Sequence, residues 1–321
     1  MSRHPRFDLT QLRTKPLENR RNKVSLDDLL TLPVPSDRAE VEQRLPDIPN
    51  REEFRHFGRR VRLAGDTGRP VVWMMGAHVI KVGCSPLVID LAERGVISCV
   101  AMNGAGMIHD FELALIGATS EDVEENLTDG AFGMWEETGA LLHESAREAL
   151  ADGLGYGEGA GRFIDRLDPP HKEASLLWRL WRAEVPVTIH SAIGTEIIHQ
   201  HPQMDGAMVG ALTWRDFLIF TGHLTALCSG AAVLNVGSAV ILPEVFLKAL
   251  SMVRNAGFDA SGFHAANFDM IDHYRPRVNV VSRPVSSGGT GDVFQGMHEV
   301  LLPSLYELIV AEPGPLEEEE R

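Results

Sequence analysis

Short runs of apolar residues alternate along the chain with longer stretches in which apolar residues recur every three or four positions. Six apolar runs predict strands, at residues 71–75, 96–102, 185–190, 231–236, 262–266 and 279–282. The periodic stretches predict helices at residues 85–94, from near 108, and at 133–151, 172–183, 214–228, 243–255 and 293–310. Because the runs are continuous rather than alternating, each strand is expected to be covered on both faces. The pattern therefore predicts a doubly wound, mostly parallel α/β sheet with helices on both faces.

The two ends of the chain lack this pattern. Residues 1–60 are polar and interrupted by proline, with one short helix expected at residues 25–30, where Ser25 is a candidate cap. We expect this segment to be an extension that packs on the main body or on a neighbouring subunit. A single domain is predicted for residues 61–312. Residues 313–321 include four consecutive glutamates and are expected to form a disordered acidic tail.

Composition narrows the function classes. The 321 residues include three cysteines without a C-x-x-C spacing, which excludes a disulfide framework and a thiolate zinc finger. The formal net charge of −15 argues against nucleic acid as the main partner and is compatible with a cationic substrate. No apolar stretch approaches the roughly 20 residues of a membrane span, and the N-terminus lacks the apolar segment of a signal peptide. The sequence predicts a cytoplasmic protein with no membrane or nucleic-acid partner.

Small residues gather in the loops that are expected to follow strands. In a doubly wound sheet, ligands bind beyond the carboxyl ends of the strands, where loops lead into helices. Five segments are expected at such places: residues 76–83, 103–110, 191–196, 237–239 and 286–292. Four of the five combine small residues with a helix start, which lets backbone N–H groups approach a phosphate. Together they indicate a dinucleotide site, although the G-x-G-x-x-G motif is absent.

Histidines and carboxylates near these loops are candidates for chemistry. Three histidines fall within twelve residues, close to two carboxylates: His190, His199 and His201, with Glu196 and Asp205. Such a cluster can hold a metal, face a substrate or make structural contacts, and we expect no metal here. The segment 109–112, His-Asp-Phe-Glu, places two carboxylates on the first turn of a predicted helix. These carboxylates either complement the helix dipole or face a ligand.

Several short segments form an ordered set between about residue 70 and residue 305. They are Asn103-Gly104-Ala105-Gly106 with His109-Asp110, Val185-Pro186-Val187, the stretch from Gly194 to His201, Arg254-Asn255-Ala256-Gly257, Phe268-Asp269, Arg275-Pro276 and Gly291-Asp292. In this order they resemble motifs of the deoxyhypusine synthase family. Residues 103–120 are also similar to the N-A-x-x-x-H-D-x-E-x-A-L-x-G-T-S segment of archaeal-type ornithine cyclodeaminases. The resemblance implies a large Rossmann-like domain, NAD bound at the strand ends, and a homotetramer.

The resemblance also implies roles for individual residues. The cofactor NAD is expected to be framed by loop residues at the strand ends, namely Gly76, His78, Asn103, Gly104, Ala105, Asp110, Gly237, Ser238 and Asp292. A small cationic amine or amino acid is expected to face four side chains, Glu196, His199, His201 and Asp272. A histidine or glutamate of this set would take a proton as hydride leaves the substrate. Glu196 and Asp272 keep an acidic residue where the family has one in its amine pocket.

One part of the family pattern is missing from this chain. The family passes an aminobutyl group through an imine on a lysine, and the matching position here is Val285. The family's paired histidines are also absent, because the matching stretch falls near Pro243. The chain has five lysines and none after Lys248, so Lys81 in the first loop is the one that could substitute. We therefore predict an NAD-dependent enzyme that acts on an amine, polyamine or amino acid by hydride transfer without that lysine. The alternative is a non-catalytic NAD-binding or scaffold protein of the same fold.

Overall fold

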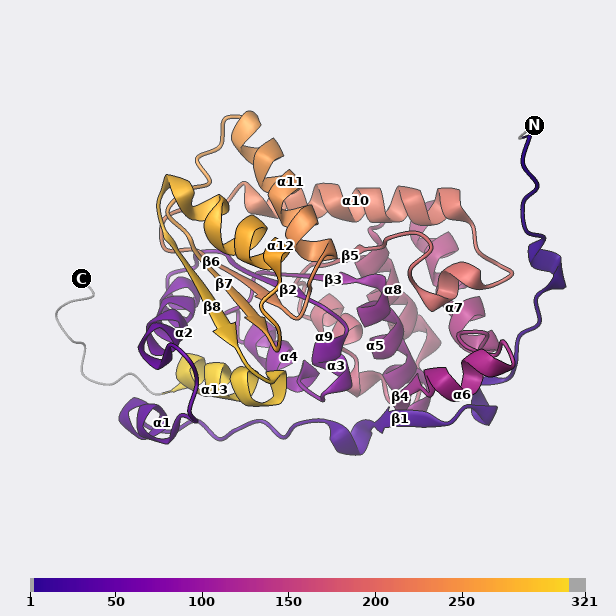
Figure 1. Ribbon diagram of the computed structural model, residues 1–321, viewed down its shortest axis with the longest axis horizontal. Coiled ribbons are helices and arrows are strands. Elements are labelled where there is room, and N and C mark those ends of the chain that lie inside the picture. Colours follow the sequence, from indigo (N-terminus) through magenta and orange to yellow (C-terminus); the bar gives the residue numbers. More distant parts are fainter. Residues whose placement is uncertain (1–2, 312–321) are drawn as a thin grey trace.

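The computed structural model describes residues 3–311, which form one main sheet flanked by helices (Figure 1). Six parallel strands lie in the order β5-β3-β2-β6-β7-β8. Their bounds are Val71–Met75 (β2), Cys99–Asn103 (β3), Val187–His190 (β5), Ala232–Val236 (β6), His264–Asp269 (β7) and Thr290–Gln295 (β8). A separate antiparallel pair joins β1 (Asn22–Ser25) to β4 (Ala118–Glu121). The predicted doubly wound parallel sheet is confirmed.

Helices cover both faces of the sheet, with α10 and α11 above it and α13 below it in Figure 1. The helices are α1 (Arg38–Arg44), α2 (Arg51–Asp66), α3 (His78–Lys81), α4 (Ser85–Glu93), α5 (Gly104–Ile116), α6 (Val123–Thr128), α7 (Glu136–Ala151), α8 (Tyr156–Leu167), α9 (Leu176–Arg182), α10 (Gly206–Leu224), α11 (Ile241–Asn255), α12 (Tyr274–Pro276) and α13 (His298–Val310). Strand side chains alternate between the two faces, so Trp73 and Met75 join one core cluster while Val72 and Met74 join the other. Each such fully buried side chain stabilises the fold by about 1.5–3 kcal/mol.

The direction in which the sheet is wound reverses between β2 and β6. From β2 the chain moves outward to β3 and then to β5, whereas β6, β7 and β8 extend the other side of the sheet. The loops after β2 and β6 therefore leave the carboxyl edge in opposite directions, and we call the place between them the β2–β6 crevice, after the general rule for such sheets. This is the place where a Rossmann-like sheet binds its ligands.

Two predicted elements differ from the structure. Residues 279–282 were expected to be a strand, but they belong to a π-helical turn at Arg277–Ser282 (η6), where the Asn279 amide donates to Glu244 Oε1 on α11 at 2.9 Å. A four-residue apolar run does not distinguish a strand from a buried helical turn, and tertiary contacts decide it. Residues 290–295, where the pattern predicts a loop and the start of a helix, form edge strand β8, whose glycine and aspartate interrupt the strand pattern.

The N-terminal extension lies on the body of its own chain. Strand β1 and a following 3-10 turn, Leu26–Asp28, appear where the short helix was expected, and Ser25 and Asp28 form a capping box. The Arg20 guanidinium donates to Glu112 of α5 at 2.6 Å, and both side chains are 1% exposed. Helix α2 begins at Arg51, so the predicted domain boundary falls inside a core helix. The predicted acidic tail lies outside the described residues.

Candidate functional site

Two glycine-containing loops meet at the crevice between β2 and β6. Gly76 donates its N–H to the Val236 carbonyl at 2.9 Å, and Gly237 donates to Phe268 at 2.9 Å. A Cβ at Gly76 would overlap the Gly237 carbonyl oxygen, so the two loops touch only because Gly76 has no side chain. Gly237 has a φ of 65°, a backbone conformation that favours glycine. The structure thus brings together two of the residues that were expected to frame a cofactor.

Polar groups without partners lie beside this contact. The His78 ring, on the short helix after β2, is 5.4 Å from the His298 ring, and His298 Nε2 lies 3.2 Å from the Phe268 carbonyl. Among residues 3–311, neither His78 Nε2 nor His298 Nδ1 has a hydrogen-bond partner, although both atoms are buried. Lys81, one turn along from His78, makes no ion pair or hydrogen bond within the same residues. Unpartnered nitrogens and a free ammonium suit an anionic group such as a phosphate.

Electrostatics at this point favour an uncharged His78. Burial lowers the pKa of His78 from its ordinary value, and His298 and Lys81 lower it further, against the opposing charges of Glu299 and Asp269. A neutral imidazole still donates one hydrogen bond, while Lys81 supplies the positive charge. The turn after β2 therefore carries one cation and one imidazole, and the His298 ring of α13 lies beside that imidazole.

A second constellation lies at the start of α5, after β3. Asn103 caps this helix through its side chain, whose Oδ1 accepts from Gly106 at 3.1 Å. Glu196 approaches from the loop after β5, and its Oε1 accepts the Gly104 N–H at 3.0 Å. Its second oxygen, Oε2, lies 3.2 Å from His199 Nε2. A Cβ at Gly104 would overlap the Glu196 carboxylate, so the space that Gly104 leaves open is taken by Glu196.

The Glu196–His199 pair is buried, and the pKa values of both side chains are shifted from their ordinary values. Burial raises the pKa of Glu196 to about 7, although the nearby Ser191 and the Gly104 and Ala192 N–H groups favour the ionised form. Burial also lowers the pKa of His199, followed by the nearby His143. His199 Nδ1 accepts from the Gly194 and Glu196 N–H groups at 3.2 and 3.3 Å, so the ring proton lies on Nε2. Nε2 is 3.2 Å from Glu196 Oε2, but among residues 3–311 neither atom has a hydrogen-bond partner. A carboxyl group that titrates near neutral pH is suited to general acid–base chemistry.

Other predicted site residues have structural roles instead. Asp110 is fully buried and accepts from Ser175 Oγ at 2.5 Å and from the Leu176 and Leu177 N–H groups at 2.7 and 3.0 Å. It therefore caps α9 and does not face a cofactor, which corrects the prediction. Ser238 is likewise engaged, because its Oγ accepts from Leu242 in the first turn of α11 at 3.2 Å. The Asp110 carboxylate is fully buried and both of its oxygens accept hydrogen bonds from the start of α9, so it is not exposed to a ligand.

His201 is directed away from Glu196. Residues Ile197–Gln200 form a 3-10 helix (η5), so His199 and His201 do not point in the same direction as they would in an extended segment. The His201 ring stacks on His143 of α7 at 5.7 Å, with 22° between the planes, and is 2% exposed. Burial lowers the pKa of His201 to about 4. His201 holds the loop against α7, and its predicted place in the substrate pocket is not borne out.

Two predicted carboxylates lie far from Glu196. Asp272 follows β7, and its side chain forms an ion pair with Arg277. Strands β3 and β7 are three positions apart in the sheet, which separates their ends by about 14 Å. Asp292 lies within β8, in register with Ala266, because residues 286–289 enter this strand from its amino end. The fifth predicted loop is therefore at the opposite edge of the sheet from the crevice, and Asp292 does not frame it.

Two asparagines in the crevice region were missed by the sequence analysis. Asn235 and Asn267 are fully buried on neighbouring strands, and Asn235 Nδ2 donates to Asn267 Oδ1 at 2.7 Å and to the Ser238 carbonyl at 3.0 Å. This amide pair fixes the turn that follows β6. The sequence feature that could have identified these two asparagines is a polar residue near the end of each of two mostly apolar strands.

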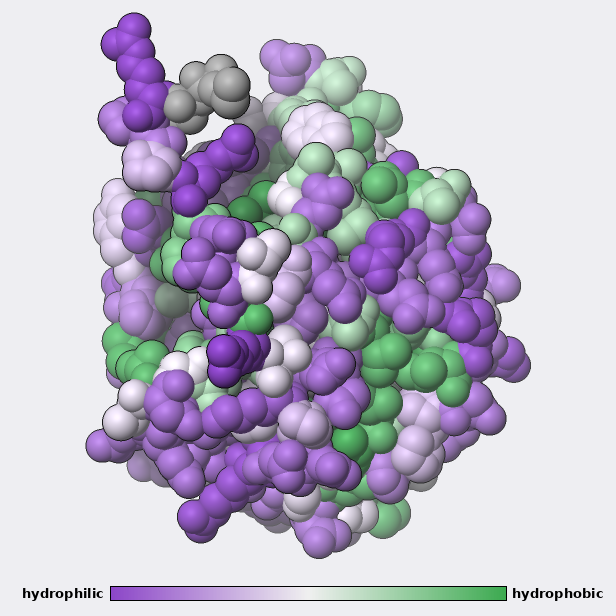
Figure 2. Space-filling view, turned by 90° about the vertical axis from the view of Figure 1, so that its right-hand side faces the viewer, coloured by the Kyte–Doolittle hydropathy of each residue, from purple (hydrophilic) through white to green (hydrophobic). Residues whose placement is uncertain are grey.

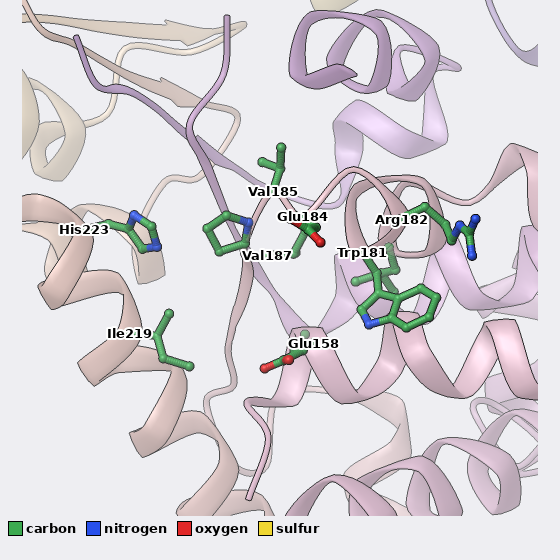
Figure 3. Close-up of a pocket in the computed structure, with 11 residues that line it drawn as sticks. Glu158, Trp181, Arg182, Glu184, Val185, Val187, Ile219 and His223 are labelled. Carbon is green, nitrogen blue, oxygen red and sulfur yellow. The ribbon is translucent and has the colours of Figure 1, made fainter. Parts of the chain in front are cut away.

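Cavities occur at both ends of β5. A groove of about 850 Å³ begins at His190, where the strand ends, and runs between α10 and α11. A cavity of about 750 Å³ lies at the amino end of the strand, where Ile219 and His223 face Glu158 across the space and Trp181 forms a wall (Figure 3). Neither lining includes Glu196 or His199, but the first includes Ser191 and Ala192, which lie close to Glu196. Within residues 3–311, no three His, Cys, Asp or Glu side chains are close enough to hold a metal, and no helix has the length and apolar character to cross a membrane.

Comparison with known proteins assigns no family. No family model and no curated protein matches the sequence. Similar solved structures include AgrE in complex with ornithine and NAD+ (14% identity, TM-score 0.49, covering 86% of this chain and 34% of that one), the cyanobacterial arginine dihydrolase ArgZ (14%, 0.45, 80% and 32%) and a conserved putative LOR/SDH protein from Methanococcus maripaludis S2 (13%, 0.46, 87% and 73%). The chain spans about a third of the length of AgrE and ArgZ. With TM-scores below 0.5, these likenesses assign neither a family nor an activity to the chain.

Proposed function

We propose that this chain is an NAD-dependent enzyme that oxidises an amine, polyamine or amino acid by hydride transfer. The observation that carries the proposal is the winding reversal between β2 and β6, with unpartnered donors on one side and a buried acid–base pair on the other. Such reversal points are where doubly wound sheets bind nucleotides. The motif resemblance to deoxyhypusine synthase supports the same class, and the homotetramer that it implies belongs to the proposal.

Three residues would hold the cofactor at the crevice. Lys81 and His78 would bind its phosphate groups, and Gly76 keeps the loop close enough for backbone contact. When bound, NAD+ accepts a hydride from the carbon that carries the amine. Gly104, which was expected with Ala105 to approach the cofactor, donates its N–H to the Glu196 carboxylate, so we propose that these two residues lie at the boundary between cofactor and substrate.

Glu196 would act on the substrate amine. An ammonium must lose one proton before its carbon gives up hydride, and the products are then an iminium ion and the reduced cofactor. The Glu196 carboxylate takes this proton, and the Nε2–H of His199 steadies its charge. A base with a pKa near 7 is half ionised at neutral pH, so it both accepts and releases the proton readily. No lysine imine is needed for this reaction.

A single assay tests the proposal. Purified protein is mixed with NAD+ and a panel of amines, polyamines and amino acids, and the NADH absorbance is followed. We expect turnover with at least one amine and a decrease of about 100-fold in Glu196→Gln. Glu158→Gln, which changes an exposed carboxylate in the other cavity, is the matched control and should retain full activity. Absence of turnover with every amine, together with retained NAD binding, would favour the non-catalytic alternative, which the structural roles of Asp110 and His201 support.

A further inference from the structure

The groove between α10 and α11 has mostly apolar walls. Its lining includes two aromatic side chains from α10 and several aliphatic ones from the start of α11, namely Trp214, Phe217, Val240, Ile241 and Val245. The two rings lie 5.5 Å apart with 30° between their planes. At the rim, Glu244 forms ion pairs with both Lys248 and Arg275. A volume of about 850 Å³ falls within the range of roughly 300–1,000 Å³ that is typical of small-molecule sites.

The apolar surface of this groove is open to solvent. Trp214, Val240 and Met252 are 56%, 45% and 41% exposed. Figure 2 shows green, apolar side chains in several separate places on the side of the molecule that it views. Apolar side chains that gather around a concavity mark a binding site more often than scattered ones do. The face is therefore a candidate ligand site rather than an ordinary helix surface.

One end of the groove lies next to the acid–base pair. Ser191 and Ala192 line the groove, and both lie close enough to Glu196 to favour its ionised form. Within residues 3–311, the only ion-pair contact of Glu196 is His199, which carries no charge in the arrangement described above. A carboxylate at the end of an apolar groove is complementary to a ligand with an ammonium group at one end and an apolar body at the other.

We propose that the groove binds the aromatic ring of an arylalkyl amine whose ammonium group lies at Glu196. This inference rests on the proposed function and narrows its substrate class to amines with a large planar apolar group. The tilted pair of Trp214 and Phe217 offers ring faces and edges for offset or edge-to-face contact with such a ring. A compact amine such as ethylamine would leave the groove empty and gain none of this burial.

A larger side chain at Gly210 would fill part of the groove without steric overlap. Gly210 lies in the α10 wall, and a Cβ at this position would have no atom within 4 Å, so a larger side chain enters open space. Leucine is also a better helix former than glycine, so Gly210→Leu should fold. Gly222 lies on the same helix, is equally open and lines neither cavity described above. Gly222→Leu is therefore the matched control.

The test is a calorimetric titration of phenethylamine, without cofactor, into the full-length protein and both variants. We expect phenethylamine to bind the wild type and Gly222→Leu alike, about ten-fold more weakly to Gly210→Leu, and about ten-fold more tightly than ethylamine to the wild type. Equal affinity for Gly210→Leu and the wild type, or equal affinity of the two amines, overturns the proposal. Adenosine is titrated in parallel, and a Gly210-dependent binding of adenosine instead of phenethylamine also overturns it, because the groove would then take a nucleotide base.

This outcome is separable from failure of the proposed function. Phenethylamine binding is measured in the absence of NAD, whereas the proposed function requires NAD binding and turnover. Loss of phenethylamine binding in Gly210→Leu without any NADH formation would support the groove and contradict the enzyme. Turnover of putrescine or ornithine with no phenethylamine binding would support the enzyme and contradict the groove.

Discussion

Burial of the Glu196 carboxyl predicts a specific pH dependence of stability. In the folded chain its pKa is about 7, against an ordinary value of 4.5, because the side chain is buried. The folded state therefore holds this proton more tightly than the unfolded state does, so the group stabilises the fold at low pH. That stabilisation is lost as the pH rises through 7. Glu196→Gln replaces the carboxyl with an uncharged group of the same shape and removes the dependence.

The size of the effect follows from these two pKa values. Between pH 5 and pH 8, a group with a folded pKa of about 7 and an unfolded pKa of 4.5 lowers the free energy of unfolding by about 2.5 kcal/mol. Burial raises the pKa of Asp110 to about 6 and of Asp216 to about 7, so both act in the same direction. Buried His190 and His201, with pKa values lowered to about 3 and 4, act in the opposite direction. All four remain in the variant, so the difference between the two proteins isolates Glu196.

Urea unfolding at several pH values between 5 and 8 measures this difference. The wild type should lose about 2.5 kcal/mol more than Glu196→Gln over this range, while Glu158→Gln, at an exposed carboxyl, should follow the wild type. Parallel pH profiles for the wild type and Glu196→Gln would show that the carboxyl titrates normally. The acid–base role proposed for it would then lose its physical basis.

Three further predictions concern neighbouring residues. Arg20→Met leaves the Glu112 carboxylate buried without its cation and should lower the free energy of unfolding by about 3–5 kcal/mol in urea titrations; a loss under 1 kcal/mol would contradict the buried pair. Asp110→Ala removes the cap of α9 and should cost about 3 kcal/mol while leaving NAD affinity unchanged by calorimetry; a loss of NAD affinity in folded protein would restore a cofactor role. Borohydride trapping with spermidine and NAD should leave no adduct after residue 248, as mass spectrometry can check, and an adduct that disappears in Lys81→Arg would instead indicate a covalent mechanism.

Much of the fold could be predicted from hydrophobic patterning. Strand β2 begins and ends at the predicted residues, because five consecutive apolar side chains leave little choice. Strand β8 was not predicted, because an edge strand needs apolar residues on one face only. Thr290, Gly291 and Asp292 interrupt the apolar pattern of that face as well. Helix α5 begins four residues before the expected start, since Asn103 caps a first turn whose glycines resemble a loop.

The candidate site was harder to predict than the fold. Sequence motifs correctly placed Gly76, Gly237 and Glu196 near the carboxyl edge, because loops after parallel strands must gather there. The motifs did not distinguish side chains that face a ligand from side chains that cap a helix. Asp110, for example, caps α9, which begins 66 residues later in the chain. Such pairings depend on tertiary packing that no local pattern records. The structure also revealed Asn235 and His298, whose roles arise from contacts between distant strands and helices.

An NAD titration tests most directly whether the β2–β6 crevice is a cofactor site. Calorimetry is carried out on the wild type, on Lys81→Met, and on Lys172→Met as a control at a lysine that pairs with Asp168 on the surface. We expect saturable binding of one NAD per chain, weakened about ten-fold or more in Lys81→Met because a charge-assisted phosphate contact is lost, and unchanged in Lys172→Met. An absence of NAD binding to the wild type, or equal affinity in Lys81→Met, would contradict it.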